Sequence, residues 1–324
     1  MNPTTGKPPA RALLTAAVCG ALAAASTVPV TAAATFHRRA FALGPLTLAS
    51  HGLPYHRGLC ATPGIANRDS AAEPTIVSDP RRPNRLLAAW FAAPDYDGLD
   101  HAGIVNLLSR SDDAGRHWHL LPARGTSACI GGREPKDADA AVDWARDGRS
   151  YFVGNPGHLA NGIPTTKLAV FRFDPAGRRA SRPLVVPAPV GYNDRPTVTA
   201  DPAHPARLYV IWVLHRPDSR DQVLLATSRD RGQRWSVRTI HIAQGTGLWG
   251  TQIFPAGGHR LVVTYRNITR VGRWRIEALR SRDGGQTWST PTLVGTVTPG
   301  VIHASGINTA MGSPSSPRPG PKAP

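Results

Sequence analysis

A turn motif that occurs three times is the feature that most constrains the fold of this chain. Its clearest copy, residues 281–288, has the pattern S-x-D-x-G-x-T-W. Gly285 supplies the positive φ that a tight hairpin needs, and the side chains of Ser281 and Asp283 can accept hydrogen bonds from amides of the turn. Trp288 then begins the return strand with a large apolar surface to bury. The motif therefore predicts a β-hairpin that is closed by its own side chains.

The other copies lie at residues 111–118 and 228–235, and a degenerate copy without the Trp lies at residues 173–177. Ser228 precedes Ser281 by 53 residues and follows Ser111 by 117, about two such periods. A fixed period of this length is typical of solenoids, propellers and arrays. We interpret the fixed positions as structural rather than catalytic or metal-binding. They are Ser111, Asp113, Gly115 and Trp118; Ser228, Asp230, Gly232 and Trp235; and Ser281, Asp283, Gly285 and Trp288.

A second repeat can be read at a shift of 122 residues. Residues 74–80 (PTIVSDP) correspond to residues 196–202 (PTVTADP), and each segment reads as a strand followed by an Asp-Pro turn. The next segments, 86–90 and 208–212, are continuous apolar runs, as expected for strands buried on both faces. A third strand leads into each turn motif and a fourth leaves it. The sequence therefore predicts an all-β fold, a β-propeller of four-stranded antiparallel blades with about four blades recognisable.

The two ends of the chain differ from this pattern. Lys7 and Arg11 precede an apolar run, and the alanines at 32–34 offer a cleavage site, so we predict a signal peptide and a secreted protein. No membrane anchor is expected after its removal. The predicted organisation is a signal peptide (1–34), an irregular leader (35–72) with one strand-like piece (41–48), the propeller (73–298), and a Pro/Ser-rich disordered tail (299–324).

Two cysteines, Cys60 and Cys129, follow the predicted signal peptide. An even number in an oxidising compartment predicts one disulfide, which would stabilise the fold by about 4 kcal/mol through loop entropy. The alternative is a pair of buried free thiols.

The formal net charge is +17, from 38 Lys and Arg against 21 Asp and Glu. A basic surface favours anionic partners, here an acidic glycan or a cell-wall polysaccharide. The alternative is a solvated surface that reflects arginine-rich codon usage. The arginines do not form a dense cluster interleaved with aromatic residues, so we expect no specific nucleic-acid partner.

The recurring turn resembles the Asp-box (BNR) repeat of the sialidase/neuraminidase superfamily, over roughly residues 73–295, as a divergent or truncated member. The resemblance implies a propeller whose Asp-box turns lie away from the active-site face. Sialidases are six-bladed. They hold the substrate carboxylate with three arginines, protonate the leaving oxygen with an Asp, and use a Tyr nucleophile activated by a Glu.

The resemblance gives each of these roles a candidate, and every candidate has a plain alternative. At the first family arginine, this chain has Glu73, which would repel a carboxylate. Arg195 opens a later blade as Arg-Pro, and Asp95 matches the acid/base position in the loop after the second strand. Glu134 is the loop glutamate that could activate a tyrosine, and Tyr265 lies at a strand end. Each could equally be a surface ion pair or a packed aromatic.

Two functional hypotheses follow. In the first, which we favour, the protein binds a glycan or a cell surface and its catalytic site is not intact. In the alternative, it is an exo-acting glycoside hydrolase of the sialidase type that releases a terminal acidic sugar. No phosphate-binding glycine loop, nucleophile elbow or HExxH motif is present, and His117-x-His119 lacks a third ligand nearby. We therefore expect no cofactor and no metal.

Overall fold

The computed structural model describes residues 45–50, 67–96, 104–121, 124–160, 163–177, 180–218, 220–269 and 273–297. The chain divides into two compact units, Met1–Pro45 and Leu46–Pro324, and every described strand belongs to the second unit. The predicted signal peptide, the predicted tail and Cys60 lie outside the described residues, so these predictions and the Cys60–Cys129 disulfide stay predictions. Within the described ranges, no helix is both long and apolar enough to cross a membrane.

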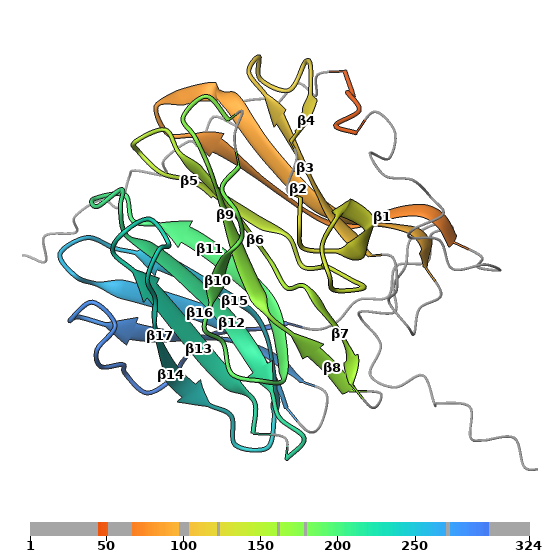
Figure 1. The fold of residues 1–324 in the computed structure, drawn as a ribbon. Coiled ribbons are helices and arrows are strands. Elements are labelled where there is room, and N and C mark those ends of the chain that lie inside the picture. Colours follow the sequence, from red (N-terminus) through yellow and green to blue (C-terminus); the bar gives the residue numbers. More distant parts are fainter. Residues whose placement is uncertain are drawn as a thin grey trace, which may run out of the picture. The chain divides into compact units, whose positions relative to one another are not determined.

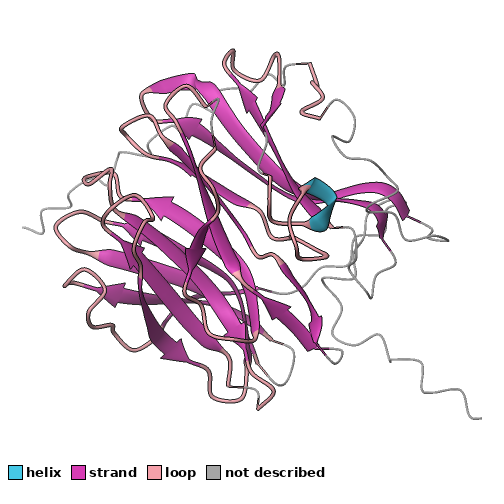
Figure 2. Ribbon diagram, viewed as in Figure 1, coloured by secondary structure: helices cyan, strands magenta, loops and turns pink. Residues whose placement is uncertain are grey.

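Four antiparallel four-stranded sheets follow one another along the chain in a ring, which makes the fold a four-blade β-propeller (Figure 1). Apart from a short 3-10 helix, η2 (Ala128–Ile130), the regular structure of the described part is all strand (Figure 2). The predicted fold class is therefore confirmed.

The blades have the following strands. Blade 1 contains β1 (Asn67–Asp79), β2 (Arg82–Tyr96), β3 (Val105–Ser111) and β4 (His119–Leu121). Blade 2 contains β5 (Ala141–Trp144), β6 (Ser150–Gly154), β9 (Leu168–Phe173) and β10 (Leu184–Val186), with the hairpin β7 (Gly157–Ala160) and β8 (Ile163–Thr166) between β6 and β9. Blade 3 contains β11 (Tyr192–Ala200), β12 (Leu208–His215), β13 (Gln222–Ser228) and β14 (Ser236–Ile242). Blade 4 contains β15 (Gly247–Pro255), β16 (Leu261–Ile268), β17 (Trp274–Ser281) and β18 (Thr292–Val297).

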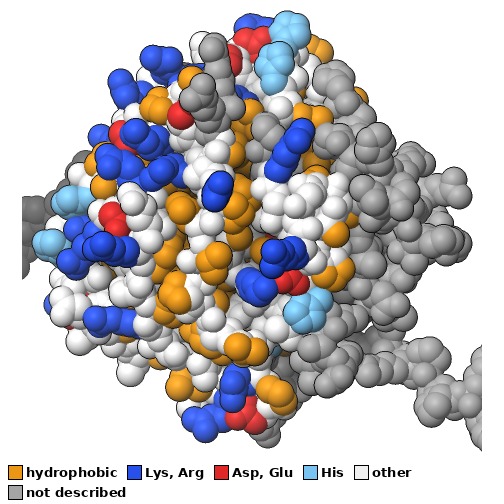
Figure 3. All heavy atoms as spheres, in the orientation of Figure 1, with side chains coloured by type: hydrophobic (Ala, Val, Ile, Leu, Met, Phe, Trp, Pro, Cys, Tyr) orange, Lys and Arg blue, Asp and Glu red, His pale blue; other side chains and the backbone are white. Residues whose placement is uncertain are grey.

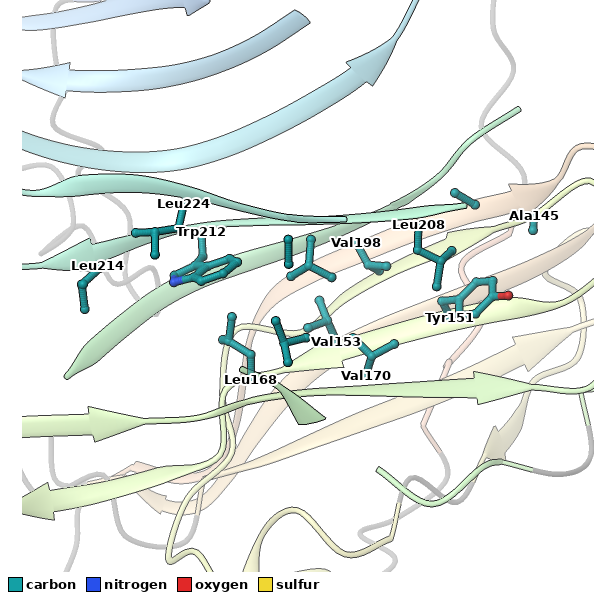
Figure 4. Close-up of a cluster of buried hydrophobic side chains, with 14 residues drawn as sticks. Ala145, Tyr151, Val153, Leu168, Val170, Val198, Leu208, Trp212, Leu214 and Leu224 are labelled. Carbon is teal, nitrogen blue, oxygen red and sulfur yellow. The ribbon is translucent and has the colours of Figure 1, made fainter. Parts of the chain in front are cut away.

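The hydrophobic core lies between neighbouring blades. Between blades 2 and 3, Tyr151 and Leu168 of one sheet meet Trp212 and Leu208 of the other, and all four side chains are fully buried (Figure 4). Similar clusters join blade 1 to blade 2 and blade 3 to blade 4. Alternate residues of β12 belong to the cluster with blade 2 and to the cluster with blade 4, so β12 is buried on both faces. β2 likewise contributes to two buried clusters, which explains the continuous apolar runs of both strands.

Each of the three turn motifs connects the last two strands of its blade. In every copy the Ser hydroxyl donates to the Asp carboxylate and accepts from the amide of the Gly, both at 2.8 Å. The glycines have φ between +86° and +90°, the left-handed conformation that an L-residue adopts at a cost. We call residues 111–118, 228–235 and 281–288 the Ser-Asp-Gly-Trp turns.

Some boundaries differ from the sequence-based expectation. β1 begins at Asn67, inside the segment predicted to be an irregular leader. β2 runs to Tyr96, so Asp95 lies in a strand, opposite Arg68, and not in a loop. Residues 45–48 of the strand-like piece 41–48 form no strand, and its remaining residues are outside the described ranges. β1 and β2 pair over more residues than the apolar pattern predicts, because the backbone ladder runs from Asn67 opposite Tyr96 to Asp79 opposite Arg82.

Candidate functional site

The inner strands of three blades carry a bulge that presents a residue in the left-handed conformation. The register slips between Ala72 and Thr75 in β1, between Asp194 and Thr197 in β11, and between Trp249 and Gln252 in β15. The left-handed residues are Glu73, Arg195 and Gly250, and Asp139 just before β5 is the corresponding residue of blade 2, with φ from +47° to +60°. Only Gly250 adopts this conformation without cost. The other three are strained positions of the kind that collect at functional sites.

Glu73, Asp139 and Arg195 meet one another. Arg195 Nη2 forms an ion pair with Glu73 Oε1, and both side chains are largely buried. The Asp139 carboxylate accepts from Asn155 Nδ2 at 2.6 Å and from the Arg195 amide at 3.4 Å. Burial raises the pKa of Asp139 well above its ordinary value, and the negative charges of Asp194 and Glu73 raise it further. Asp139 is therefore a carboxyl group that tends to hold its proton beside a second carboxyl group.

A buried histidine with two carboxylate partners lies next to this group. His215 Nε2 is 3.0 Å from Asp194 Oδ2, and His215 Nδ1 is 2.9 Å from Asp221 Oδ2. Burial alone would lower the pKa of His215, but its hydrogen bonds to Asp194 and Asp221 outweigh burial and raise the pKa to about 9. His215 is thus an imidazolium at neutral pH, with both ring nitrogens donating.

A row of aromatic and cationic side chains continues from the same place into blade 4. The centroid of the Trp249 ring is 5.4 Å from the guanidinium carbon of Arg195 and 5.7 Å from that of Arg266. Arg266 also stacks on Trp274 at 4.4 Å. The His215 ring lies 5.4 Å from that of Trp249. These side chains are partly exposed, and the Arg266 Nε atom is buried without a hydrogen-bond partner in the described part of the chain. We call Glu73, Asp139, Arg195, His215, Trp249 and Arg266 the central site.

Lys136 lies at the edge of the central site. Lys136 is 7 % exposed. Burial lowers the pKa of its amine, although the negative charges of Asp139 and Asp194 raise it. It makes no ion pair with another described residue. Lys136 is therefore a cation close to the carboxylates of the central site.

Three of the four candidate catalytic residues have side chains that the structure describes: Arg195, Glu134 and Tyr265. Of these three, only Arg195 lies at the central site. Glu134 instead binds Lys167 Nζ at 2.5 Å and His158 Nδ1 at 2.9 Å, which ties the β7–β8 hairpin to the preceding loop. Asp95 is placed in β2 by its backbone, and its side chain is outside the description.

Tyr265 lies inside β16 and not at a strand end. Its side chain is 1 % exposed, packs in the core between blades 3 and 4, and stacks on His241. Its cross-strand partner is Glu277, and burial followed by the charge of Glu277 raises the pKa of Tyr265. The structure therefore pairs Tyr265 with Glu277 and not with Glu134.

Sequence reasoning missed Asp139, His215, Trp249 and Arg266. A signal for Asp139 existed, because it lies two residues before a strand-like segment, as Glu73 and Arg195 do before residues 75–79 and 197–200. His215 is the last residue of β12, whereas Trp249 and Arg266 lie within β15 and β16, and nothing local in the sequence marks these three residues. In the described ranges, no three His, Cys, Asp or Glu side chains are arranged to hold a metal ion.

No protein-family model matches the sequence, and no curated protein matches it either. Solved structures do match in fold. A protein of unknown function from Dyadobacter fermentans is similar at 16% identity, 71% coverage of each chain and a TM-score of 0.55. The intramolecular trans-sialidase from Ruminococcus gnavus is similar at 14% identity, with 70% of this chain and 71% of that chain covered and a TM-score of 0.54.

The NanB sialidase from Streptococcus pneumoniae is similar at 12% identity and a TM-score of 0.51, with 77% of this chain covered against 54% of that chain. This chain thus spans about half the length of that sialidase. At such identities the likeness defines the fold, which is that of a sialidase-like β-propeller.

Proposed function

We propose that this protein is an exported propeller that binds a glycan with a terminal acidic sugar at the central site and does not cleave it by the sialidase route. The observation that carries the proposal is the ion pair between Glu73 and Arg195. It places a carboxylate of the protein on the arginine that would otherwise receive the carboxylate of a substrate.

The features that support binding lie beside this ion pair. Burial lowers the pKa of Arg266, and the positive charge of Arg195 lowers it further. Two guanidinium groups this close together attract a carboxylate, which arginine can hold in a bidentate manner. Trp249 and Trp274 flank Arg266 and offer partly exposed indole faces. Aromatic faces provide apolar surface for the C–H groups of a sugar ring. Arg266 therefore replaces Arg195 as the group that would bind the acid.

The arrangement of Tyr265 supports the absence of sialidase chemistry. A tyrosine nucleophile must reach the substrate and lose its proton. Tyr265 is buried between two blades and its pKa is raised, and Glu134 is bound to other partners. Neither residue is placed for the role that the family resemblance would give it.

A glycoside hydrolase is the second candidate, and the carboxyl pair of Glu73 and Asp139 favours it. Glycosidases need one protonated and one ionised carboxyl group, and the raised pKa of Asp139 suits a general acid. In this hypothesis Asp139, or Asp95 as the sequence suggests, would protonate the leaving oxygen.

The deciding experiment combines a fluorogenic sialoside assay with calorimetric titration of N-acetylneuraminic acid and sialyllactose, with lactose as the neutral control. We expect no turnover, and we expect the two acidic ligands to bind while lactose does not. Arg266→Ala should abolish this binding, and Arg124→Ala, at an exposed arginine in the loop after β4, should leave it intact. Turnover that Asp139→Asn or Asp95→Asn removes would establish the hydrolase instead. If neither acidic ligand binds and none is cleaved, both hypotheses are wrong.

A further inference from the structure

We propose a second binding site, for a linear acidic polysaccharide, in the cleft between blades 3 and 4. It lies among the Ser-Asp-Gly-Trp turns, at the opposite end of the strands from Arg195, and so does not depend on the proposed function. The cleft has a volume of about 730 Å³, and its lining includes Arg229, Arg234, Arg238, Trp235, His259 and Gln286. Ligand sites in proteins commonly have volumes of roughly 300–1,000 Å³.

The grooves between the other blades are bridged at this end. Between blades 1 and 2, Arg85 Nη2 donates to the Pro175 carbonyl at 2.8 Å, and Arg110 donates to that of Ala176. Between blades 2 and 3, Arg231 Nε is 3.3 Å from Asp147 Oδ2. No such hydrogen bond or ion pair joins the turns of blades 3 and 4 in the described part of the chain. The third groove is therefore open where the first two are closed.

The open cleft carries an excess of positive charge. Arg229, Arg234 and Arg238 are exposed, and their side chains form no ion pair with a described residue, whereas Arg207 is paired with Asp201 at 3.2 Å. His259 is also exposed. Figure 3 shows that Lys and Arg side chains are more frequent than acidic ones on the visible face of the protein.

The two carboxylates in the lining, Asp230 and Asp283, are occupied by their own turns. Asp230 Oδ1 accepts from Ser228 and from the Arg234 amide, and Asp283 accepts from Ser281 and Thr287. Their oxygens are therefore held in place by these donors and do not pair with the three arginines.

A comparison of repeats shows what opens the cleft. In blade 1, Leu108 pairs with Leu121, which packs against the core between blades 1 and 2. The equivalent pair in blade 3, counted from the Ser of each turn, is Leu225 with Arg238. Where blade 1 places a leucine against its neighbour, blade 3 places an arginine. This change removes apolar contact and adds a cation facing the cleft.

The lining favours a polysaccharide over single-stranded nucleic acid. Proteins that bind single strands stack successive bases on several exposed aromatic rings. Of the aromatic residues in this lining, Trp235 packs against the core between blades 2 and 3, and Tyr209 is 2 % exposed and hydrogen-bonded to Asp201. The three guanidinium groups fit the carboxylate or sulfate groups of an acidic polysaccharide.

The test is calorimetric titration with a heparin octasaccharide and with an oligogalacturonate, which separate sulfate from carboxylate recognition. Maltooctaose is the neutral control and a single-stranded DNA 12-mer the competing class. We expect one of the acidic oligosaccharides to bind, more weakly as salt increases. The pair Arg229→Gln and Arg238→Gln should weaken binding about tenfold or more. The matched pair is Arg116→Gln in blade 1 and Arg124→Gln in the loop that follows β4, and it should leave binding within about twofold.

Equal loss in both pairs would mean binding by overall charge and would overturn the proposal, as would no binding of either acidic oligosaccharide. If the DNA binds as tightly and with the same dependence on Arg229 and Arg238, the site is one for nucleic acid. Binding of N-acetylneuraminic acid at the central site should not respond to these substitutions, so the two proposals fail separately. Unchanged thermal unfolding of each variant shows that the fold is intact.

Discussion

Glu73 and Arg195 occupy the same position of two repeats, 122 residues apart in the sequence, and form an ion pair with each other. Each lies in a bulge of an inner strand in the left-handed conformation. The repeat that builds the blades therefore also brings these two side chains together. A carboxylate at one copy and a guanidinium at the other form a pair that an acidic ligand must compete with.

Replacing Glu73 with Gln should strengthen the binding of an acidic sugar. The substitution removes the carboxylate that competes for Arg195 and also lowers the pKa of Asp139, because one of the charges that raise it is gone. We expect affinity for N-acetylneuraminic acid to rise roughly threefold to tenfold in calorimetric titration. Glu134→Gln, which breaks ion pairs elsewhere, is the control. Weaker binding by Glu73→Gln would show that Glu73 itself contacts the ligand.

The protein should lose stability as the pH rises above neutral because His215 loses its proton. The folded pKa of about 9 lies above the ordinary value of 6.5, so this contribution is complete below pH 6.5 and disappears as the pH passes through 9. We expect a decrease on the order of 2–3 kcal/mol in the free energy of unfolding, measured with urea at several pH values.

The His215→Gln variant should show a flatter profile between pH 7 and 9, whatever its absolute stability. Burial raises the pKa of Asp137 to about 7 and that of Asp143 to about 6, so these carboxyl groups contribute in the same direction at lower pH. A variant with the same slope as the parent above pH 7 would rule out His215 as the titrating group.

Asn193 should be among the least replaceable polar residues of the fold. Asn193 is fully buried. Its side-chain Nδ2 donates to the Thr166 and Pro189 carbonyls, and its side-chain Oδ1 accepts from Trp212 Nε1 at 2.7 Å. Asn193→Ala leaves these groups buried without partners and should cost about 3–5 kcal/mol in urea unfolding. Gln244→Ala, at an exposed position, should cost less than about 0.5 kcal/mol. If Asn193→Ala lowered the free energy of unfolding as little as Gln244→Ala does, water would have to replace the side-chain amide of Asn193.

The Ser-Asp-Gly-Trp turn of blade 4 can be tested with Ser281→Ala. The substitution removes the hydrogen bonds of the Ser281 hydroxyl to Asp283 and Gly285, in a residue that is 2 % exposed. We expect a loss of about 1–2 kcal/mol and a lower melting temperature. Thr290→Ala, an exposed position two residues after the turn, is the control. An unchanged melting temperature would contradict a structural role for the motif.

Tyr265→Phe separates the binding and catalytic hypotheses at the level of one hydroxyl group. Because Tyr265 is buried between blades 3 and 4, we expect glycan affinity to stay within about twofold and stability to change by less than about 1 kcal/mol. The measurements are calorimetric titration and urea unfolding. Loss of a sialoside-cleaving activity in this variant would instead assign Tyr265 the role of nucleophile.

The sequence by itself determined the blade period and the fold class. The interactions behind the turn motif act within a few residues: Ser281 contacts Asp283 and Gly285, and the same contacts recur in the other copies. Such contacts are visible in the sequence because the partners are adjacent in the chain. The continuous apolar runs of β2 and β12 also predicted strands, since a strand that is buried on both faces has apolar residues at successive positions.

Only the tertiary structure decided which side chains form the central site. Asp139, Arg195, His215 and Arg266 come from three blades, and their proximity depends on how the blade ends converge. It also decided that Tyr265 faces a neighbouring sheet and that Arg238 opens a cleft where Leu121 closes one. In a strand the side chains alternate between two faces, and the sequence does not tell which neighbour each face meets. That assignment arises when the blades pack together.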